Sequence, residues 1–447
     1  MVIYMDRAEV PDVEQIRPEV LRYLLDKAQR QVGRFRMLED YYLGNHPALR
    51  GKKGEGEVRV AVNYAKYVVD MALGYYLGEA VKYDSNEIAR AGAQRGGKID
   101  LSWLLYWYDF QNIAEVDLEL GRGMGIFGEC IELCYASSEQ RPRPRSTWLF
   151  PGNAVLVCDD SVEHRKLFGM VWERRESLTG QQYYTMTVYT DRTIRHYRSA
   201  DVKNIAFYPE GEVQEHWFGE VPMILYENNG PRQGDFEQII SLIDAYNQLL
   251  SSRLTDKKKF VDALLVFFGM TLREGDEGRL ARERFLDGAP LDARVEYIQK
   301  TFDESGVQVL ADALVREMHK MTQTVDMSDE KFSGNSSGQA LKLKLLSMEL
   351  LVKSKMRRME KGLKERLRLY NRWLYAMGEM DLVDPAEVDV VFTVNRPIDE
   401  EGILDLVTRL QGIVDDQTLL SQLWFVKDPA EALENVRKQK EEGEKDE

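Results

Sequence analysis

The stretch Val325-Asp-Met-Ser-Asp-Glu-Lys-Phe-Ser-Gly-Asn-Ser-Ser-Gly338 has neither a helical nor a strand pattern, and a long periodic segment follows it as far as Met377. Apolar residues in that segment recur at alternating steps of three and four, as along one helix face: Leu341, Leu345, Met348, Val352, Met356, Met359, Leu363, Leu367, Tyr370 and Leu374. About 37 residues at about 1.5 Å each predict a rod of about 55 Å. No proline interrupts it, and Gly362 should weaken it by about 1 kcal/mol relative to alanine.

The other faces of this rod are strongly basic. They carry Lys342, Lys344, Lys353, Lys355, Arg357, Arg358, Lys361, Lys364, Arg366, Arg368 and Arg372. A helix much longer than the usual 10–14 residues or so has to cross a domain or line an assembly. The basic residues can form either a solvated face or a contact with another molecule, and the helix alone does not decide between the two.

Composition limits the protein class. With 447 residues, of which 44% are apolar and 10% aromatic, the chain can build two to four domains with real cores. A formal net charge of −15 argues against a basic nucleic-acid-binding domain but allows a local basic surface. Three cysteines are too few for a disulfide framework, which favours a reducing compartment. The N-terminus lacks a signal-peptide pattern, and the apolar run 58–80 carries too many charges to span a membrane, so we expect a soluble, intracellular protein.

The N-terminal half predicts helices followed by strands. Helices are expected over 17–43, stopped by Gly44 and Pro47, from Asn63 as N-cap to Gly78, and over 101–120. From Glu129 to Tyr226 the apolar period changes to two, which predicts an antiparallel, β-rich domain inserted between helices. Its candidate strands are Glu129–Tyr135, Ala154–Cys158, Gly169–Arg174, Tyr183–Thr190, Thr193–Arg198, Val202–Phe207 and Met223–Tyr226.

Helices return after Pro231, which makes the predicted fold class α+β. Two helices, 234–259 and 303–323, flank a compact α/β piece over about 270–299. That piece follows an apolar segment at 263–268 and holds a helix near 276–285 and a strand at 294–298. Beyond the rod, the pattern predicts a strand at 388–394, helices at 399–411 and 418–423, and a charged tail from Asp428.

No pattern in the chain predicts catalysis, a metal site or a cofactor. Gly123-Met-Gly-Ile-Phe-Gly128 fits a dinucleotide-binding spacing, but a helix precedes it and a strand follows, which is the reverse of the required order. Cys130 and Cys134 have even spacing in a strand, which predicts two buried thiols on one face rather than zinc ligands. We therefore expect a protein that is not an enzyme.

Three stretches of this chain resemble the portal proteins of tailed bacteriophages, of the siphophage (Gp6-like) type. They are Val62–Gly78, Asn228–Ser251 with its continuation Phe260–Gly269, and Ser337–Leu346 with the basic rod that follows. Their order and spacing match that family from about residue 15 to about 430. The resemblance implies a ring, usually of twelve subunits, at one vertex of the phage head.

The resemblance also implies a division of the chain into the parts of that family. These are a wing (1–233), two stem helices (234–259 and 302–324), a clip (260–301), a tunnel loop (325–338), a long wing helix with a returning strand (339–395), and a short crown with a charged tail (396–447). The ring would conduct double-stranded DNA, without sequence specificity, during packaging and ejection. Its implied partners are the terminase large subunit, the major capsid and scaffolding proteins and the head–tail adaptor, in a virion assembled in the host cytoplasm.

The implied site residues fall in two places. The DNA channel and tunnel loop would use Met327, Ser328, Asp329, Glu330, Lys331, Phe332, Asn335, Ser336, Lys342 and Lys344. The clip would bind its partners through Arg279, Arg282 and Arg284. An acidic channel with few basic contacts suits sliding, because many Lys and Arg contacts would hold the duplex in place. The alternatives are a capsid-associated adaptor or a nucleic-acid-processing enzyme of a phage head module, and only the portal interpretation requires a large closed ring.

Overall fold

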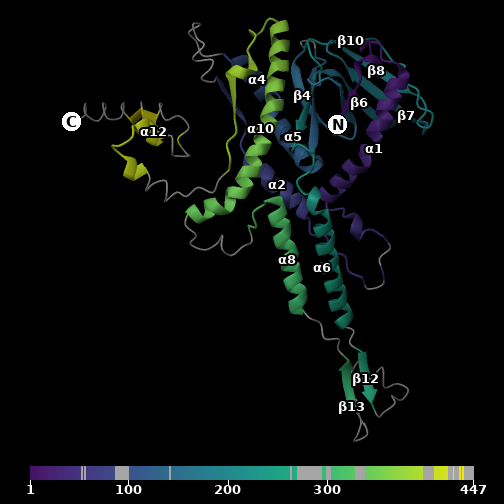
Figure 1. Cartoon of the computed structure of the whole chain (residues 1–447), viewed down its shortest axis with the longest axis vertical. Coiled ribbons are helices and arrows are strands. Elements are labelled where there is room, and N and C mark those ends of the chain that lie inside the picture. The colour runs from purple at the N-terminus through teal and green to yellow at the C-terminus, as the bar shows by residue number, and fades with distance from the viewer. Residues whose placement is uncertain are drawn as a thin grey trace.

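A computed structural model describes residues 1–51, 54, 57–85, 100–139, 142–261, 264–268, 294–298, 304–327, 338–395, 407–420, 426, 432–433 and 435–436. At 259–261, 264–268, 294–298 and 338–344 it describes the backbone alone. The α+β class is confirmed, with helices and sheets in one body and a two-helix projection leading away from it (Figure 1).

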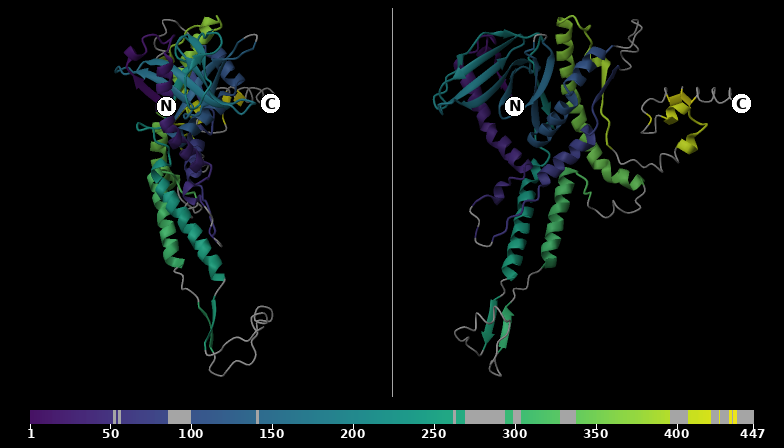
Figure 2. Two further views of the ribbon diagram at one scale, coloured as in Figure 1. Left: turned by 90° about the vertical axis from the view of Figure 1, so that its right-hand side faces the viewer. Right: turned by 180° about the vertical axis from the view of Figure 1, so that it is seen from behind.

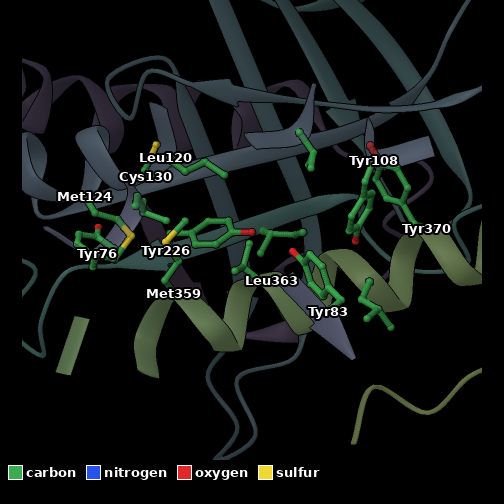
Figure 3. Packing of buried hydrophobic residues seen from close by; sticks show 14 of the residues in the cluster. Tyr76, Tyr83, Tyr108, Leu120, Met124, Cys130, Tyr226, Met359, Leu363 and Tyr370 are labelled. Atoms are coloured by element: carbon green, nitrogen blue, oxygen red, sulfur yellow. The ribbon is translucent and has the colours of Figure 1, made fainter. Parts of the chain in front are cut away.

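The longest helix, α10 (Gly338–Ala376), runs along the body and carries its main core (Figures 1 and 3). The predicted apolar stripe is confirmed at Leu345, Met348, Val352, Met359, Leu363, Leu367, Tyr370 and Leu374, which are all buried. The stripe packs against α2 (Tyr64–Leu77), α4 (Ser102–Phe110) and α5 (Ile113–Phe127), and against a three-stranded sheet. That sheet has the order β11 (Met223–Glu227), β3 (Glu129–Ala136), β4 (Pro144–Leu149).

A second sheet of seven strands lies beside this core. Along its path it has the order β1 (Val2–Met5), β5 (Ala154–Asp159), β6 (Lys166–Glu176), β7 (Gln182–Tyr189), β8 (Thr193–Ser199) and β10 (Gln214–Glu215), with β9 (Tyr208–Pro209) also paired to β8. Helix α1 (Pro18–Tyr42) covers one face and buries Leu21, Leu24 and Leu25 there. The antiparallel pairing expected within 129–226 is confirmed, and the N-terminal strand β1, which was not predicted, adds a parallel pair with β5.

The remaining elements are short or lie at the edges. Strand β2 (Lys82–Ser85) pairs with β14 (Val388–Val391), and β12 (Leu264–Phe268) pairs with β13 (Arg294–Ile298). Helices α6 (Ile240–Val261) and α8 (Glu304–Thr322) form the projection, and α12 (Asp416–Leu420) lies near the C-terminus. Single 3-10 turns occur at Arg7–Glu9, Pro47–Leu49, Glu237–Ile239 and Pro385–Glu387.

Two sequence predictions are corrected locally. The helix expected over 101–120 is two helices, because Asn112 takes a left-handed conformation (φ 54°) and starts α5 in a new direction; asparagine tolerates that conformation better than most residues. The strand expected at Val202–Phe207 is a turn, in which Asp201 accepts a hydrogen bond from the amide of Lys203 (2.8 Å) and Ser199 from that of Ala206 (3.0 Å). The expected N-cap at Asn63 is confirmed, with a 3.0 Å bond from the amide of Lys66. The helix expected at 276–285 lies outside the described residues.

Arg366 connects α10 to the sheet through a fully buried ionic cluster. Its Nε donates to Glu132 Oε1 (2.6 Å), its Nη1 lies 2.6 Å from Asp117 Oδ1, and Tyr226 donates to Glu132 Oε2 (2.7 Å). Burial by itself would lower the pKa of the guanidinium. The Asp117 and Glu132 carboxylates outweigh that effect and hold the pKa of Arg366 well above its usual value. A buried arginine with such partners fixes both the position and the rotation of α10.

Gly362 lowers the helix propensity of α10 but allows close packing of a neighbouring side chain. The ring of Tyr226 lies against the α10 backbone at this position, and a Cβ on residue 362 would meet Tyr226 Cε1 at 2.3 Å. Tyr226 is itself fully buried and hydrogen-bonded, so it cannot move away. The helix therefore accepts a weak helix former in order to bring the ring close.

We expect Gly362→Ala to lower the free energy of unfolding by about 1–3 kcal/mol, because overpacking exceeds the gain in helix propensity. The matched control is Gly33→Ala in α1, where no heavy atom lies within 4 Å of the added Cβ. That change should stabilise by up to about 1 kcal/mol. Chemical denaturation measures both, and stabilisation of the same size at the two positions would contradict the packing argument.

Candidate functional site

The projection is built from two helices that are adjacent in all three views (Figures 1 and 2). Helix α6 has 22 residues and leads outward over about 33 Å, α8 returns beside it, and the β12–β13 pair lies beyond their ends. Charged side chains connect the two helices, because Arg253 and Lys257 of α6 both pair with Glu304 at the start of α8. At the base, Ile239, Ile243 and Met318 are buried in one apolar cluster.

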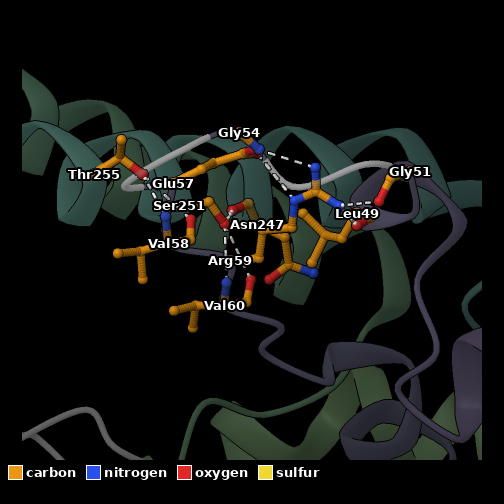
Figure 4. Close-up of polar contacts among 10 residues, drawn as sticks. All are labelled: Leu49, Gly51, Gly54, Glu57, Val58, Arg59, Val60, Asn247, Ser251 and Thr255. Carbon is orange, nitrogen blue, oxygen red and sulfur yellow. Dashed lines mark hydrogen bonds and ion pairs between the residues drawn. The ribbon is translucent and has the colours of Figure 1, made fainter.

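An extended segment, residues 58–62, lies along α6 and is called the strap below (Figure 4). The amide of Val58 donates to Thr255 Oγ1 (2.9 Å), that of Val60 to Ser251 Oγ (3.1 Å), and that of Val62 to Asn247 Oδ1 (2.8 Å). Asn247 and Thr255 donate back to the carbonyls of Val62 (3.4 Å) and Val58 (3.3 Å), whereas the single hydroxyl proton of Ser251 has its shorter acceptor in the carbonyl of Asn247 (2.7 Å). Asn247 and Thr255 thus satisfy both backbone groups of one strap residue each, and Ser251 satisfies the amide of Val60.

The strap can follow α6 because the rise of four helical residues is close to the rise of two extended residues. Four residues of α-helix rise about 6.0 Å, and two residues of extended chain rise about 6.6 Å. Asn247, Ser251 and Thr255 are four apart in α6, so each meets every second strap residue. The sequence predicts this helix over 234–259, and the i, i+4, i+8 spacing of its small polar residues is the signal by which the strap contact could have been predicted.

Arg59 closes the segment that precedes the strap. Its guanidinium donates to the carbonyls of Leu49 (2.7 Å) and Gly51 (3.1 Å) and pairs with Glu57 (3.0 Å) (Figure 4). The strap is thereby held at one end by this arginine and at the other by α2, which begins at Tyr64.

The entry to the loop that precedes α10 is fixed by the end of α8. Gln323 takes φ 56°, its amide donates to Lys320 O, and the amide of Thr324 donates to His319 O (3.1 Å). This is the Schellman arrangement, with glutamine at the position that glycine usually takes. Tyr67 of α2 then donates to the carbonyl of Val325 (2.8 Å). The chain therefore leaves the projection in a defined direction, at the point where α2 and α8 meet.

The predicted channel residues are only partly described. Met327 is exposed and its amide lies 3.5 Å from the Tyr67 hydroxyl. Lys342 and Lys344 belong to the first turns of α10, where the structure describes the backbone alone. The other predicted channel residues lie outside the described residues: Ser328, Asp329, Glu330, Lys331, Phe332, Asn335 and Ser336. The predicted clip residues Arg279, Arg282 and Arg284 also lie outside them.

The interpretation of the basic faces of α10 as a solvated face is wrong for Lys355 and Arg366, which are buried, whereas Arg358, Lys364, Arg368 and Arg372 remain part-exposed and pair with carboxylates of the same chain. Lys355 is buried in a pair with Asp235, Arg366 is buried, and Arg358 pairs with Glu227 at 3.4 Å. Arg368 and Arg372 both pair with Glu220, at 2.8 and 2.6 Å, and Lys364 pairs with Glu360. Carboxylates around β11 supply several of these partners, namely Glu220, Glu227 and Asp235, and α5, β3 and α10 itself supply the others.

Three further patterns of the sequence can be placed in the described residues. These residues contain no group of three His, Cys, Asp or Glu side chains arranged to hold a metal ion. Cys130 and Cys134 are buried, as expected, and burial raises the pKa of the Cys130 thiol to about 12. The Gly123–Gly128 pattern forms the end of α5 before β3, which is the expected order. Within the described part of the chain, no helix combines the length and apolar character that a membrane crossing requires.

The strap should depend strongly on Asn247. We expect Asn247→Ala to lower the free energy of unfolding by about 1–3 kcal/mol, because it leaves the amide and carbonyl of Val62 without partners. Hydrogen exchange should speed up at residues 58–62 and leave the α10 amides protected. Gln248→Ala removes an exposed amide one residue away and serves as the control. Equal exchange in both variants would show that the strap is held by other contacts.

The chain is similar in sequence to known proteins of one family. The family model described as phage portal protein, SPP1 Gp6-like, matches residues 21–446. The portal protein of Bacillus phage SPP1 is 24% identical over 307 residues, which cover 65% of this chain and 61% of that protein. The portal protein of Clostridium phage phiCD119 is 21% identical over 264 residues, which cover 56% of each chain. The chain thus spans about six-tenths of the length of these relatives. Because the family model covers nearly all of it, the chain belongs to the SPP1 Gp6-like family of phage portal proteins.

Proposed function

We propose that this chain is the subunit of a closed ring at one vertex of a phage capsid, which conducts double-stranded DNA during packaging and ejection. Family membership supports a portal role. In this proposal the ring is a dodecamer, assembled in the host cytoplasm and retained in the virion. The ring docks the terminase large subunit and later the head–tail adaptor, and it contacts the major capsid and scaffolding proteins.

One observation carries the proposal for this chain. The loop at 325–338 begins where the two-helix projection, α2 and the strap meet, and it ends where α10 begins. The described ends of this segment thus join the projection to the long helix, and in this proposal the segment is the loop that responds to both. We accordingly assign 234–259 and 302–324 to the stem, 260–301 to the clip, 325–338 to the tunnel loop, 339–395 to the long wing helix and returning strand, 1–233 to the wing and 396–447 to the crown and tail.

The exposed apolar side chains of the projection support assembly. Val309 and Leu310 of α8 are 68% and 51% exposed, and Leu254 of α6 and Met321 of α8 are also open to solvent. A two-helix rod has no third layer to cover such residues. Burial of each large aliphatic side chain against a neighbour would contribute about 1.5–3 kcal/mol. In a ring, the stems of adjacent subunits provide that cover.

Electron microscopy of negatively stained protein, with the mass from light scattering, tests the ring. We expect closed rings of about twelve subunits with a central hole wide enough for duplex DNA, since a heterologous contact that closes generates a ring. A compact dimer without a channel would contradict the proposal. Val309→Ser/Leu310→Ser should weaken the rings, and Leu178→Ser, which replaces a fully exposed leucine of the β6–β7 turn, is the control.

Deletion of residues 327–336 tests the channel loop separately. We expect rings to form normally and packaging of DNase-protected DNA in infected cells to fall sharply, because the loop would contact DNA rather than hold subunits together. A deletion of equal length in the charged tail, 437–446, is the control. Normal packaging without the loop would remove the loop from the mechanism and leave the ring itself unaffected. In the same proposal, Arg279, Arg282 and Arg284 act at the clip in partner binding.

A further inference from the structure

The outer face of α10 carries an uncovered stripe that combines leucines and cations. Leu346 and Leu350 are 48% and 60% exposed, and Lys353, Arg357 and Lys361 continue the same face along the helix. These five residues, called the basic stripe below, lie opposite the buried stripe of Val352, Met359 and Leu363, because 3.6 residues make one turn. The basic stripe thus faces away from the core that α10 covers.

The three cations of the basic stripe differ from the other cations of the same helix. No salt bridge to Lys353, Arg357 or Lys361 occurs among the described residues, whereas Lys355, Arg358, Lys364, Arg366, Arg368 and Arg372 all have carboxylate partners there. In a chain with a net charge of −15, carboxylates are abundant. Three cations without one, at spacings of four residues, form an electrostatic surface that is open to a partner.

A second surface of the chain has the opposite charge and a similar apolar content. The segment 377–395 contains five carboxylates and neither lysine nor arginine. Asp381 and Asp389 are exposed, Glu387 is half-buried, and no salt bridge to these three occurs among the described residues. Leu382 and Val391, 59% and 44% exposed, lie in the same segment. These five residues are called the acidic edge.

Strand pairing adds to the negative charge of the acidic edge. In the register of β2 and β14, Asp389 lies directly opposite Asp84, and like charges in that position destabilise a strand pair. Lys82 is the single cation in the sequences of these two strands. The carboxylates of Asp389 and Asp84 therefore lie side by side on this edge.

We propose that the basic stripe of one copy of this chain docks on the acidic edge of a second copy. The inference rests on the proposed ring and names the surfaces that join its subunits in the body, away from the stem. Each surface offers two exposed aliphatic side chains and three like charges, with opposite signs on the two surfaces. The surfaces lie on different parts of one chain, so the contact is heterologous and propagates around a ring rather than ending in a dimer.

A second copy fits the basic stripe better than DNA does. Phosphates would pair with Lys353, Arg357 and Lys361, but they would leave Leu346 and Leu350 without an apolar partner. The acidic edge offers Leu382 and Val391 to cover those leucines, and apolar burial of this kind adds about 25 cal/mol per Å². The overall negative charge of the chain also repels DNA, whereas it supplies carboxylates to a neighbouring copy.

The test is a charge reversal with its complement, read as particle mass in solution by mass photometry and sedimentation velocity. Lys353→Glu/Arg357→Glu/Lys361→Glu should lower the association constant at least about tenfold, because like charges across an interface repel. Asp381→Lys/Glu387→Lys/Asp389→Lys should do the same alone and should restore assembly when combined with the first set. Arg22→Glu/Arg30→Glu/Arg36→Glu on the exposed side of α1 changes the net charge equally and is the control. Circular dichroism checks that every variant is folded.

The outcomes separate the two proposals. Loss of rings in each single set, recovery in the combination and normal rings in the α1 control would establish the contact. Normal rings with the reversed stripe would overturn it and leave the proposed ring intact. A wild-type protein that never assembles would overturn both. Normal rings that have lost binding to a fluorescent duplex of about 30 base pairs would assign the stripe to DNA and overturn the contact between copies.

Discussion

The buried ion cluster around Arg366 is the interaction on which the body depends. Its guanidinium lies between Glu132 of β3 and Asp117 of α5, and Tyr226 of β11 completes the hydrogen bonding of Glu132. One side chain of α10 thereby contacts a helix and, through Glu132, the central strand β3 and the edge strand β11 of the three-stranded sheet. An ion pair excluded from water tolerates little change in geometry, since each partner loses its solvation and regains it only from the other. The cluster therefore sets the rotation of α10 more strictly than its apolar stripe can.

That rotation divides the cations of α10 into two groups. Lys355 comes three residues after Val352 and four before Met359, and Arg366 comes three after Leu363 and four before Tyr370. Both positions fall on the buried stripe by helical geometry alone, so their burial could have been predicted from the spacing. The prediction grouped all the basic residues on the faces away from the apolar stripe, and the burial of Lys355 and Arg366 was therefore missed. Which carboxylates they meet could not be predicted, because Asp117, Glu132 and Asp235 come from segments more than a hundred residues away.

Features that follow from local periodicity could be predicted from the sequence, and features that depend on distant residues could not. The length of α10, the capping by Asn63 and most strands of the large sheet follow from local periodicity, and local periodicity is present in the sequence. The parallel pair of β1 with β5 joins residues about 150 positions apart, and the strap is an extended segment that pairs with side chains of a helix instead of a strand. Neither arrangement leaves a periodic signal in its own segment. The role of Gly362 is also non-local, since it depends on the ring of Tyr226 from β11.

The strap and the Arg366 cluster each hold a long helix in a fixed position, α6 in the projection and α10 in the body. A two-helix projection has only one neighbour for each helix, and its base would bend easily if α6 were held by apolar contacts alone. Five hydrogen bonds between the strap and α6 brace the outward helix along about two turns. The strap continues into α2, which packs on α10 and also fixes the carbonyl of Val325 through Tyr67. The strap and α2 therefore connect the projection both to the loop entry and to the helix whose position Arg366 sets.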